Sequence, residues 1–203
     1  MDNLKKYRFM NMIDNFNNRD YLIATILYSA APTIAKHKPS YLIIFHNKGK
    51  RKLNNIWKIY KEDIYKELNI SFYELKNSKD STAVLFYNDF QMQEVLKDEI
   101  NIKFLKQYGY KSKMSLKQCL FLLKTRYYYN CPNEIGIFLG YPLEDVIEFM
   151  NGNQKKAIIF GYWKVYHNPS YALKIFEKYD LCREKVINLI SNKVEFIDIL
   201  KKI

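Results

Sequence analysis

The sequence predicts an α+β fold, in which a small sheet packs against a mainly helical C-terminal half. Segments between residues 40 and 87 follow the order β-α-β-β, which favours a mixed layer over a pure helical bundle. The chain after residue 88 shows mostly helical spacing of apolar residues. Around Gly140 a short turn between two apolar segments is typical of a helix-turn-helix-like corner.

The first half begins with a predicted helix over residues 8–31, which should end before Pro32. A β-type run over 41–45 comes next, and its end is marked by the polar residues 46–49. Residues 50–68 form a predicted helix, with apolar side chains at Leu53, Ile56, Trp57, Tyr60, Ile64 and Leu68. Two short strands, 70–75 and 82–87, complete the sheet around a polar turn.

The second half is predicted to be helical with one later strand. A helix over 89–108 should end at Gly109, and Ser115 should cap the next helix. The corner itself covers residues 134–149. We expect residues 157–166 to add a strand to the sheet, and Asn168 with Pro169 to begin the closing helix.

Length and composition predict a single domain over residues 1–203, which could divide into an α/β part, 1–110, and a mainly helical part, 111–203. The longest uncharged run, Tyr21 to Ala35, is shorter than the roughly 20 residues that span a bilayer, so we expect no membrane span. An odd number of cysteines, three, predicts a reducing cytoplasmic location.

A net charge of +12 raises the hypothesis of a polyanionic partner such as nucleic acid. The basic residues concentrate in segments 36–66 and 103–126, whereas segment 131–152 has four acidic residues and no basic one. Residues 143–150 would be the recognition helix of a DNA-binding corner, but they present only acidic charges to phosphates. The corner is therefore predicted to be a packing element. The basic residues are mostly lysines, 28 of 33. Lysine is less specific than arginine in binding phosphate, which weakens the polyanion hypothesis.

Cys131 is the candidate catalytic residue of a second hypothesis, a thiol-dependent enzyme. It precedes Pro132, so its thiol would lie at a helix N-terminus, where the helix dipole favours thiolate. The alternative is that Cys131 is a buried residue that caps the helix. A catalytic thiol would also need a neighbouring base, which would have to be His37, His46 or His167. Cys119 and Cys182 lie on apolar stripes and are predicted to be core residues. The cysteines and histidines of the chain show no paired spacing, so the sequence predicts no metal site.

The leading interpretation is a cleft beside the 131–142 turn that binds a small molecule or cofactor. We expect Glu134, Tyr141, Tyr162 and Lys164 to line this cleft together with Cys131. Tyrosine and lysine side chains can contact a ring and an anionic group, although an aromatic strand more often covers a core. No phosphate-binding, dinucleotide-binding or hydrolase motif is present, so the sequence identifies no particular cofactor or reaction.

Two dense blocks resemble a family of domains of unknown function from Gram-positive, largely anaerobic bacteria. The matching residues are Cys131, Pro132, Glu134 to Gly136, Phe138 to Pro142, Asp145, Val146 and Gly161 to Tyr166. Segments 31–33 and 38–40 also look like the family's N-terminal signature, so the resemblance covers nearly the whole chain. Asn133 stands where the family usually has histidine. The resemblance implies no activity.

Overall fold

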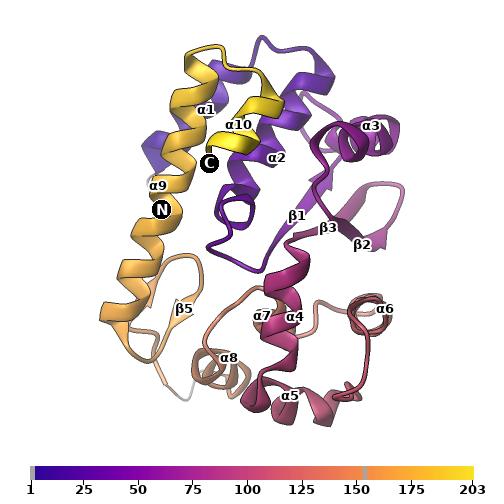
Figure 1. Ribbon diagram of the computed structural model, residues 1–203, viewed down its shortest axis with the longest axis vertical. Helices are drawn as coiled ribbons and strands as arrows, with labels where there is room; N and C mark the ends of the chain where they lie inside the picture. The colour runs from indigo at the N-terminus through magenta and orange to yellow at the C-terminus, as the bar shows by residue number, and fades with distance from the viewer. Residues whose placement is uncertain (1–2, 153–154) are drawn as a thin grey trace.

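The computed structural model describes residues 3–152 and 155–203, and it confirms the α+β fold (Figure 1). The sheet contains β1 (Ser40–His46), β2 (Phe72–Asn77) and β3 (Ser81–Tyr87), all antiparallel in the order β1-β3-β2. Helix α3 (Leu53–Leu68) connects β1 to β2, so the predicted β-α-β-β order is confirmed.

The remaining helices divide between the two ends of the molecule in Figure 1. The helices drawn at the upper end and along the left side are α1 (Asn3–Ile13), α2 (Asn18–Ile34), α9 (Pro169–Ser191) and α10 (Phe196–Lys202). The helices at the lower end are α4 (Asp89–Lys97), α5 (Glu99–Leu105), the 3-10 turn η1 (Lys106–Tyr108), α6 (Leu116–Tyr127), α7 (Ile135–Phe138) and α8 (Leu143–Met150).

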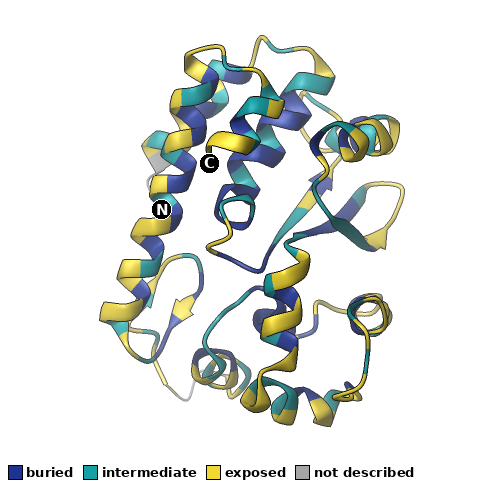
Figure 2. Ribbon diagram, viewed as in Figure 1, coloured by how far each residue is buried: buried dark blue, intermediate teal, exposed yellow. Residues whose placement is uncertain are grey.

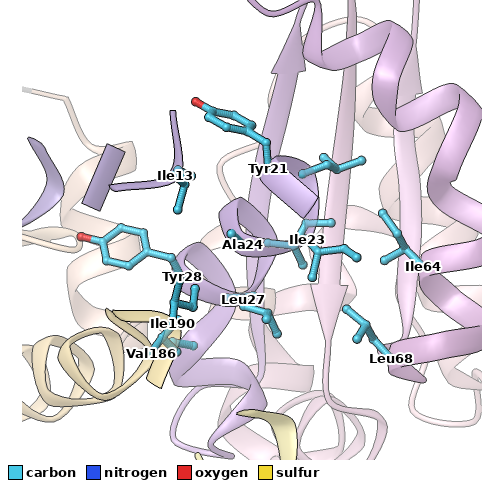
Figure 3. Packing of buried hydrophobic residues seen from close by; sticks show 14 of the residues in the cluster. Ile13, Tyr21, Ile23, Ala24, Leu27, Tyr28, Ile64, Leu68, Val186 and Ile190 are labelled. Carbon is cyan, nitrogen blue, oxygen red and sulfur yellow. The ribbon is translucent and has the colours of Figure 1, made fainter. Parts of the chain in front are cut away.

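The two faces of the sheet belong to different hydrophobic clusters, because successive side chains of a strand point to opposite faces. Val84 and Phe86 of β3 belong to the same cluster as side chains of α2, α3 and α9. Figure 2 shows that most of α2 is buried, and Figure 3 shows its side chains between those of α3 and α9. Ala83 and Leu85, on the other face, pack with α4, α6 and α7. The first cluster thus contains side chains from both ends of the chain.

The expected helix over residues 8–31 is wrong in its bounds. The chain breaks into α1 and α2 because the side chain of Asn17 accepts a hydrogen bond from the backbone of Asp20 and starts a new helix. Helix α2 continues through Pro32 to Ile34. A similar cap at Asp98 divides the expected helix 89–108 into α4 and α5, and the last turn of that segment is the 3-10 helix η1.

The expected strand over residues 157–166 is also wrong, because it does not join the sheet. A separate hairpin takes its place, formed by β4 (Ile159–Phe160) and β5 (Lys164–Val165). The turn at Gly161 lies against α9, where an added Cβ would be 2.1 Å from Cε2 of Phe176. The alternation of an extended strand therefore does not apply to residues 161–163.

Several local predictions are confirmed. Ser115 and Gln118 form a capping box at the start of α6, and Asn168 caps α9 ahead of Pro169. Gly109 ends η1 with a positive φ. The corner is formed by α7, a turn at Gly140 and α8. None of the helices within the described ranges combines the length and apolar character needed to cross a bilayer.

Candidate functional site

Segment 38–40 holds the corner in place from a distance of about a hundred residues along the chain. The ammonium of Lys38 donates hydrogen bonds to the carbonyl oxygens of Leu139 and Ser40, both at 2.8 Å. The hydroxyl of Ser40 donates to the carbonyl of Phe138 at 2.7 Å. Carbonyls at the end of a helix have no partner within the helix, so these bonds satisfy the C-terminus of α7. All of these groups are buried.

Lys38 is a buried cation, and its hydrogen bonds go to neutral carbonyls. Burial lowers the pKa of its ammonium to about 7, and the nearby charge of Arg183 acts in the same direction. Its Nζ also lies 5.6 Å from the ring centre of Tyr41 and 5.0 Å from that of Tyr141. These aromatic faces partly replace the lost hydration. The buried ammonium therefore links the β1 end of the sheet to the corner.

This pKa predicts a specific pH dependence of stability. A lysine in the unfolded chain titrates near 10.4, so between about pH 7 and pH 10 the unfolded state binds a proton that the folded state lacks. Stability then rises with pH in this window, and the penalty is fully present below pH 7. Relative to Lys38→Met, the unfolding free energy of the native protein should rise by up to about 1.4 kcal/mol per pH unit.

Urea unfolding at pH 6.5, 7.5 and 8.5 measures this difference. Lys174→Met, at an exposed position on α9, is the control and should show a difference that does not change with pH. A pH-independent difference for Lys38→Met would show that Lys38 keeps an ordinary pKa.

Asp145 attaches the hairpin to the corner. Its Oδ2 accepts a hydrogen bond from Nε1 of Trp163 at 2.7 Å. Its Oδ1 accepts from the backbone N–H groups of Tyr166, at 2.8 Å, and His167, at 2.9 Å. The carboxylate is buried, and these three donors compensate its charge. Helix α8 and the segment after β5 are thus joined by one side chain.

A pocket of about 220 Å³ lies between the corner and the hairpin. We call it the corner pocket. Its lining residues are Cys131, Pro132, Asn133, Ile135, Gly136, Tyr141, Asp145, Val146, Phe149, Trp163 and Lys164. Tyr141 and Trp163 stack with ring centres 5.3 Å apart. The Nζ of Lys164 lies 5.3 Å from the ring centre of Phe149, so an exposed ammonium borders a mostly apolar wall.

The structure brings three of the five predicted site residues together. Cys131, Tyr141 and Lys164 all line the corner pocket. Glu134 lies elsewhere: it is buried and forms a forked ion pair with Arg126 of α6, so it anchors the turn. The hydroxyl of Tyr162 donates to Oδ1 of Asp180 at 2.6 Å, so Tyr162 contacts α9.

Cys131 differs from its prediction in position and electrostatics. Helix α7 begins at Ile135, so Cys131 is not at a helix N-terminus as expected. Cys131 is exposed, yet surrounding atoms raise the pKa of its thiol by desolvation, and the charge of Glu134 raises it further, against a hydrogen bond from Tyr127. Among the described residues, no histidine forms a hydrogen bond with it. Cys119 and Cys182 are buried, as predicted.

Sequence reasoning missed the residues that build the site. Asp145 and Trp163 appeared in the two dense blocks, and Lys38 in the upstream segment, but nothing in their local spacing pairs them. Their hydrogen bonds connect residues 18 and 101 positions apart, which periodicity within one element does not reveal. The clustering of Lys38, Pro39 and Ser40 as one short motif was the available signal.

The described residues contain no group of three or more histidine, cysteine, aspartate or glutamate side chains placed to hold a metal ion.

Comparison with known proteins identifies a family but no activity. No curated protein and no solved structure matches the chain. Residues 26–200 match the family described as "Protein of unknown function (DUF3793)". This match includes the anchoring segment 38–40, the corner and the hairpin, and it covers most of the 203 residues. The chain therefore belongs to the DUF3793 family of proteins of unknown function.

Proposed function

We propose that the corner pocket binds a small, largely apolar molecule that carries one anionic group, such as an aromatic carboxylate. The observation that supports this most strongly is an apolar pocket bordered by a single lysine. Ligand pockets usually combine apolar walls with a few polar groups that orient the ligand. In this pocket the walls come from Ile135, Val146 and Trp163, and the orienting charge comes from Lys164.

The size of the pocket limits the ligand. At about 220 Å³ it lies below the roughly 300–1,000 Å³ that is usual for drug-sized ligands. It is larger than a cavity of about 150 Å³, which is enough for benzene. We therefore expect a molecule with one ring, or an aliphatic chain of similar volume.

The charges of the pocket favour an anion over a cation. Lys164 is the only basic residue in the described lining, and no described carboxylate forms an ion pair with it. Asp145 is the acidic residue of the lining, but its two oxygens already accept three hydrogen bonds. A carboxylate ligand would thus meet a free ammonium and a compensated carboxylate.

The thiol-enzyme hypothesis has less support than binding. A nucleophilic cysteine needs a lowered pKa and a neighbouring base, whereas Cys131 has a raised thiol pKa and no histidine partner among the described residues. We propose that Cys131 forms part of the pocket wall.

The odd number of cysteines, three, supports a cytoplasmic location for the protein.

Benzoate and benzamide form a matched pair of probes, since they have similar shape and differ in charge. Isothermal titration should show benzoate binding about 5-fold more tightly than benzamide, because an exposed ion pair contributes up to about 1 kcal/mol. In Lys164→Gln this preference should disappear, whereas Lys178→Gln, an exposed change on α9, should keep it.

Protection of Cys131 localises the binding. Bound benzoate should slow alkylation of Cys131 by iodoacetamide in the native protein and in Lys178→Gln. Equal affinities of the two probes in the native protein would refute the anionic preference. Saturable binding without protection of Cys131 would place the ligand outside the corner pocket.

A further inference from the structure

Another pocket lies between the edge strand β2 and helix α6, which Figure 1 shows on the opposite side of the molecule from α8 and β5. We call it the β2–α6 groove. It has a volume of about 730 Å³, and its lining residues are Leu75, Lys76, Asn77, Ser78, Phe121, Lys124, Thr125, Tyr128 and Tyr129. This lining shares no residue with the corner pocket.

Three aromatic side chains stand out from the groove wall with little cover. Phe121, Tyr128 and Tyr129 are 65%, 68% and 79% exposed. Large aromatic rings contribute most to stability when they are buried, so three exposed rings beside one hollow contribute little to folding. The rings of Tyr128 and Tyr129 lie edge to face with centres 5.3 Å apart, which leaves ring surface open to a planar partner.

Lysines alternate with these rings. Helix α6 has no acidic residue, and Lys117, Phe121 and Lys124 follow one another at spacings of four and three, with Tyr128 four residues further on. Residues with this spacing share one face of a helix. From β2, the Nζ of Lys76 donates to the carbonyl of Tyr128 at 3.0 Å and lies 6.0 Å from the centre of its ring. Cations and rings therefore form one continuous surface.

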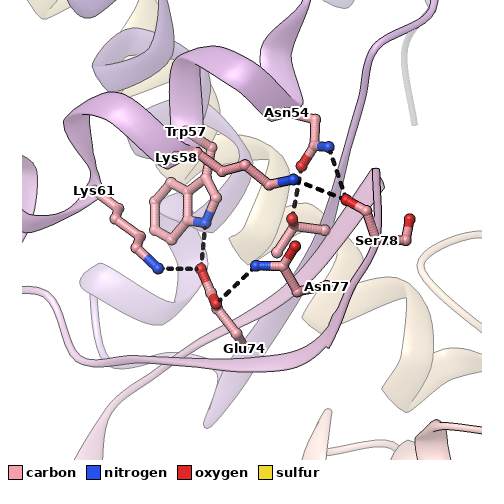
Figure 4. Close-up of polar contacts among 8 residues, drawn as sticks. Asn54, Trp57, Lys58, Lys61, Glu74, Asn77 and Ser78 are labelled. Carbon is pink, nitrogen blue, oxygen red and sulfur yellow. Dashed lines mark hydrogen bonds and ion pairs between the residues drawn. The ribbon is translucent and has the colours of Figure 1, made fainter. Parts of the chain in front are cut away.

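The β2–β3 turn places Lys58, from the basic segment 36–66, next to the groove, whose α6 wall belongs to the basic segment 103–126. Lys58 of α3 donates to the carbonyl of Ser78, a groove residue, at 2.8 Å (Figure 4). The neighbouring acidic residue Glu74 does not line the groove, and its carboxylate accepts hydrogen bonds from Trp57, Lys61 and Asn77, as Figure 4 also shows. The described groove lining thus contains lysine but no carboxylate.

We propose that the β2–α6 groove binds a short stretch of single-stranded nucleic acid. Bases would stack on Tyr128, Tyr129 and Phe121, and Lys76 and Lys124 would contact the phosphates between them. Proteins that bind single strands without sequence preference use this combination of aromatic platforms and a basic track. The paired bases of a duplex already stack on one another, so their faces are not available to these rings. Exposed rings and unopposed lysines meet in this one groove, a feature that the net charge of the chain alone would not predict.

Fluorescence anisotropy with a fluorescein-labelled twelve-residue oligothymidylate tests the proposal at low salt. Tyr128→Ala should weaken binding by about 5-fold or more, because one stacked base is lost. Tyr128→Phe keeps the ring and should bind like the native protein. Phe90→Ala, which removes an equally exposed ring on α4, is the matched control and should have no effect.

The salt dependence of the binding constant distinguishes contacts with phosphates from a general electrostatic attraction. For single strands, the slope of log K against log salt changes by about 0.7 for each phosphate contact, so replacing both Lys76 and Lys124 by Gln should reduce it by about 1.4. Replacing Lys174 and Lys178 of α9 in the same way should leave the slope unchanged. An unchanged affinity in Tyr128→Ala, or equal affinity for duplex DNA, would overturn the proposal. Competition by polyglutamate at equal charge concentration would do so as well, because it would show a general polyanion surface.

Discussion

Gly140→Ala should lower the free energy of unfolding by about 2–4 kcal/mol. Gly140 has φ +71°, a left-handed conformation that costs about 1–2 kcal/mol for other residues. An added Cβ would also lie 2.5 Å from Cδ of Pro39, and both belong to backbone-constrained segments. Relief of this clash between the added Cβ and Pro39 would require segment 38–40 to move away from the corner. The hydrogen bonds of Lys38 and Ser40 to α7 would then lengthen or break.

Gly49→Ala is the matched control for this change. Gly49 also has a positive φ, +82°, but an added Cβ would meet no atom within 4 Å. Urea unfolding of the two variants separates the backbone cost from the cost of the contact with Pro39, and we expect Gly49→Ala to lose only about 1–2 kcal/mol. Equal losses at the two positions would mean that the contact between Pro39 and Gly140 adds nothing to stability.

Asp145→Asn should lower the free energy of unfolding by about 2–4 kcal/mol and release the hairpin from the corner. The amide of asparagine has a single acceptor oxygen, whereas Asp145 uses both oxygens to accept from three N–H groups. At least one buried donor would lose its partner or face another donor. Because Trp163 and Lys164 are part of the corner pocket, benzoate binding should weaken together with stability.

Glu148→Gln makes the same chemical change on the same helix, at a half-buried position whose carboxylate forms no hydrogen bond or ion pair within the part of the chain that the structure describes. We expect its effect to stay within about 0.5 kcal/mol, as for most surface substitutions. Urea unfolding and benzoate titration should be carried out on both variants. If Asp145→Asn were as stable as Glu148→Gln, the buried carboxylate would not be the link between α8 and the hairpin.

The elements that could be predicted from sequence are those with local signals. Ser115 and Asn168 are followed by the residues that complete a cap, and both start helices where expected. The β-α-β-β order could be read because turn residues separate short apolar runs. The N-terminal break also has a local signal, because the polar run 14–20, in which Phe16 is the one apolar residue, contains the cap Asn17. The hairpin at 159–165 resembles one strand in sequence because its turn contains Tyr162 and Trp163, which pack against α9.

The sequence indicated a turn beside which the structure has a pocket, but it could not show how the lining of that pocket comes together. The dense block 131–142 does border a pocket, and Cys131, Tyr141 and Lys164 line it. Glu134 and Tyr162 do not line this pocket, because they bind Arg126 and Asp180 of other helices, which the sequence pattern did not indicate. Lys38 illustrates the general reason. Its role depends on carbonyl oxygens a hundred residues away, and no local pattern encodes the approach of β1 to α7.

Fluorine NMR can measure whether a ligand binds in the corner pocket. The chain has two tryptophans, so labelling with 5-fluorotryptophan gives two resonances, which the variant Trp57→Phe assigns. Trp163 lines the corner pocket, whereas Trp57 is buried in the cluster beneath α3 and serves as an internal reference. Titration with benzoate should shift the Trp163 resonance to saturation and leave Trp57 unmoved. A Trp163 resonance that does not move, or one that moves in parallel with the Trp57 resonance, would show that benzoate does not bind in the corner pocket.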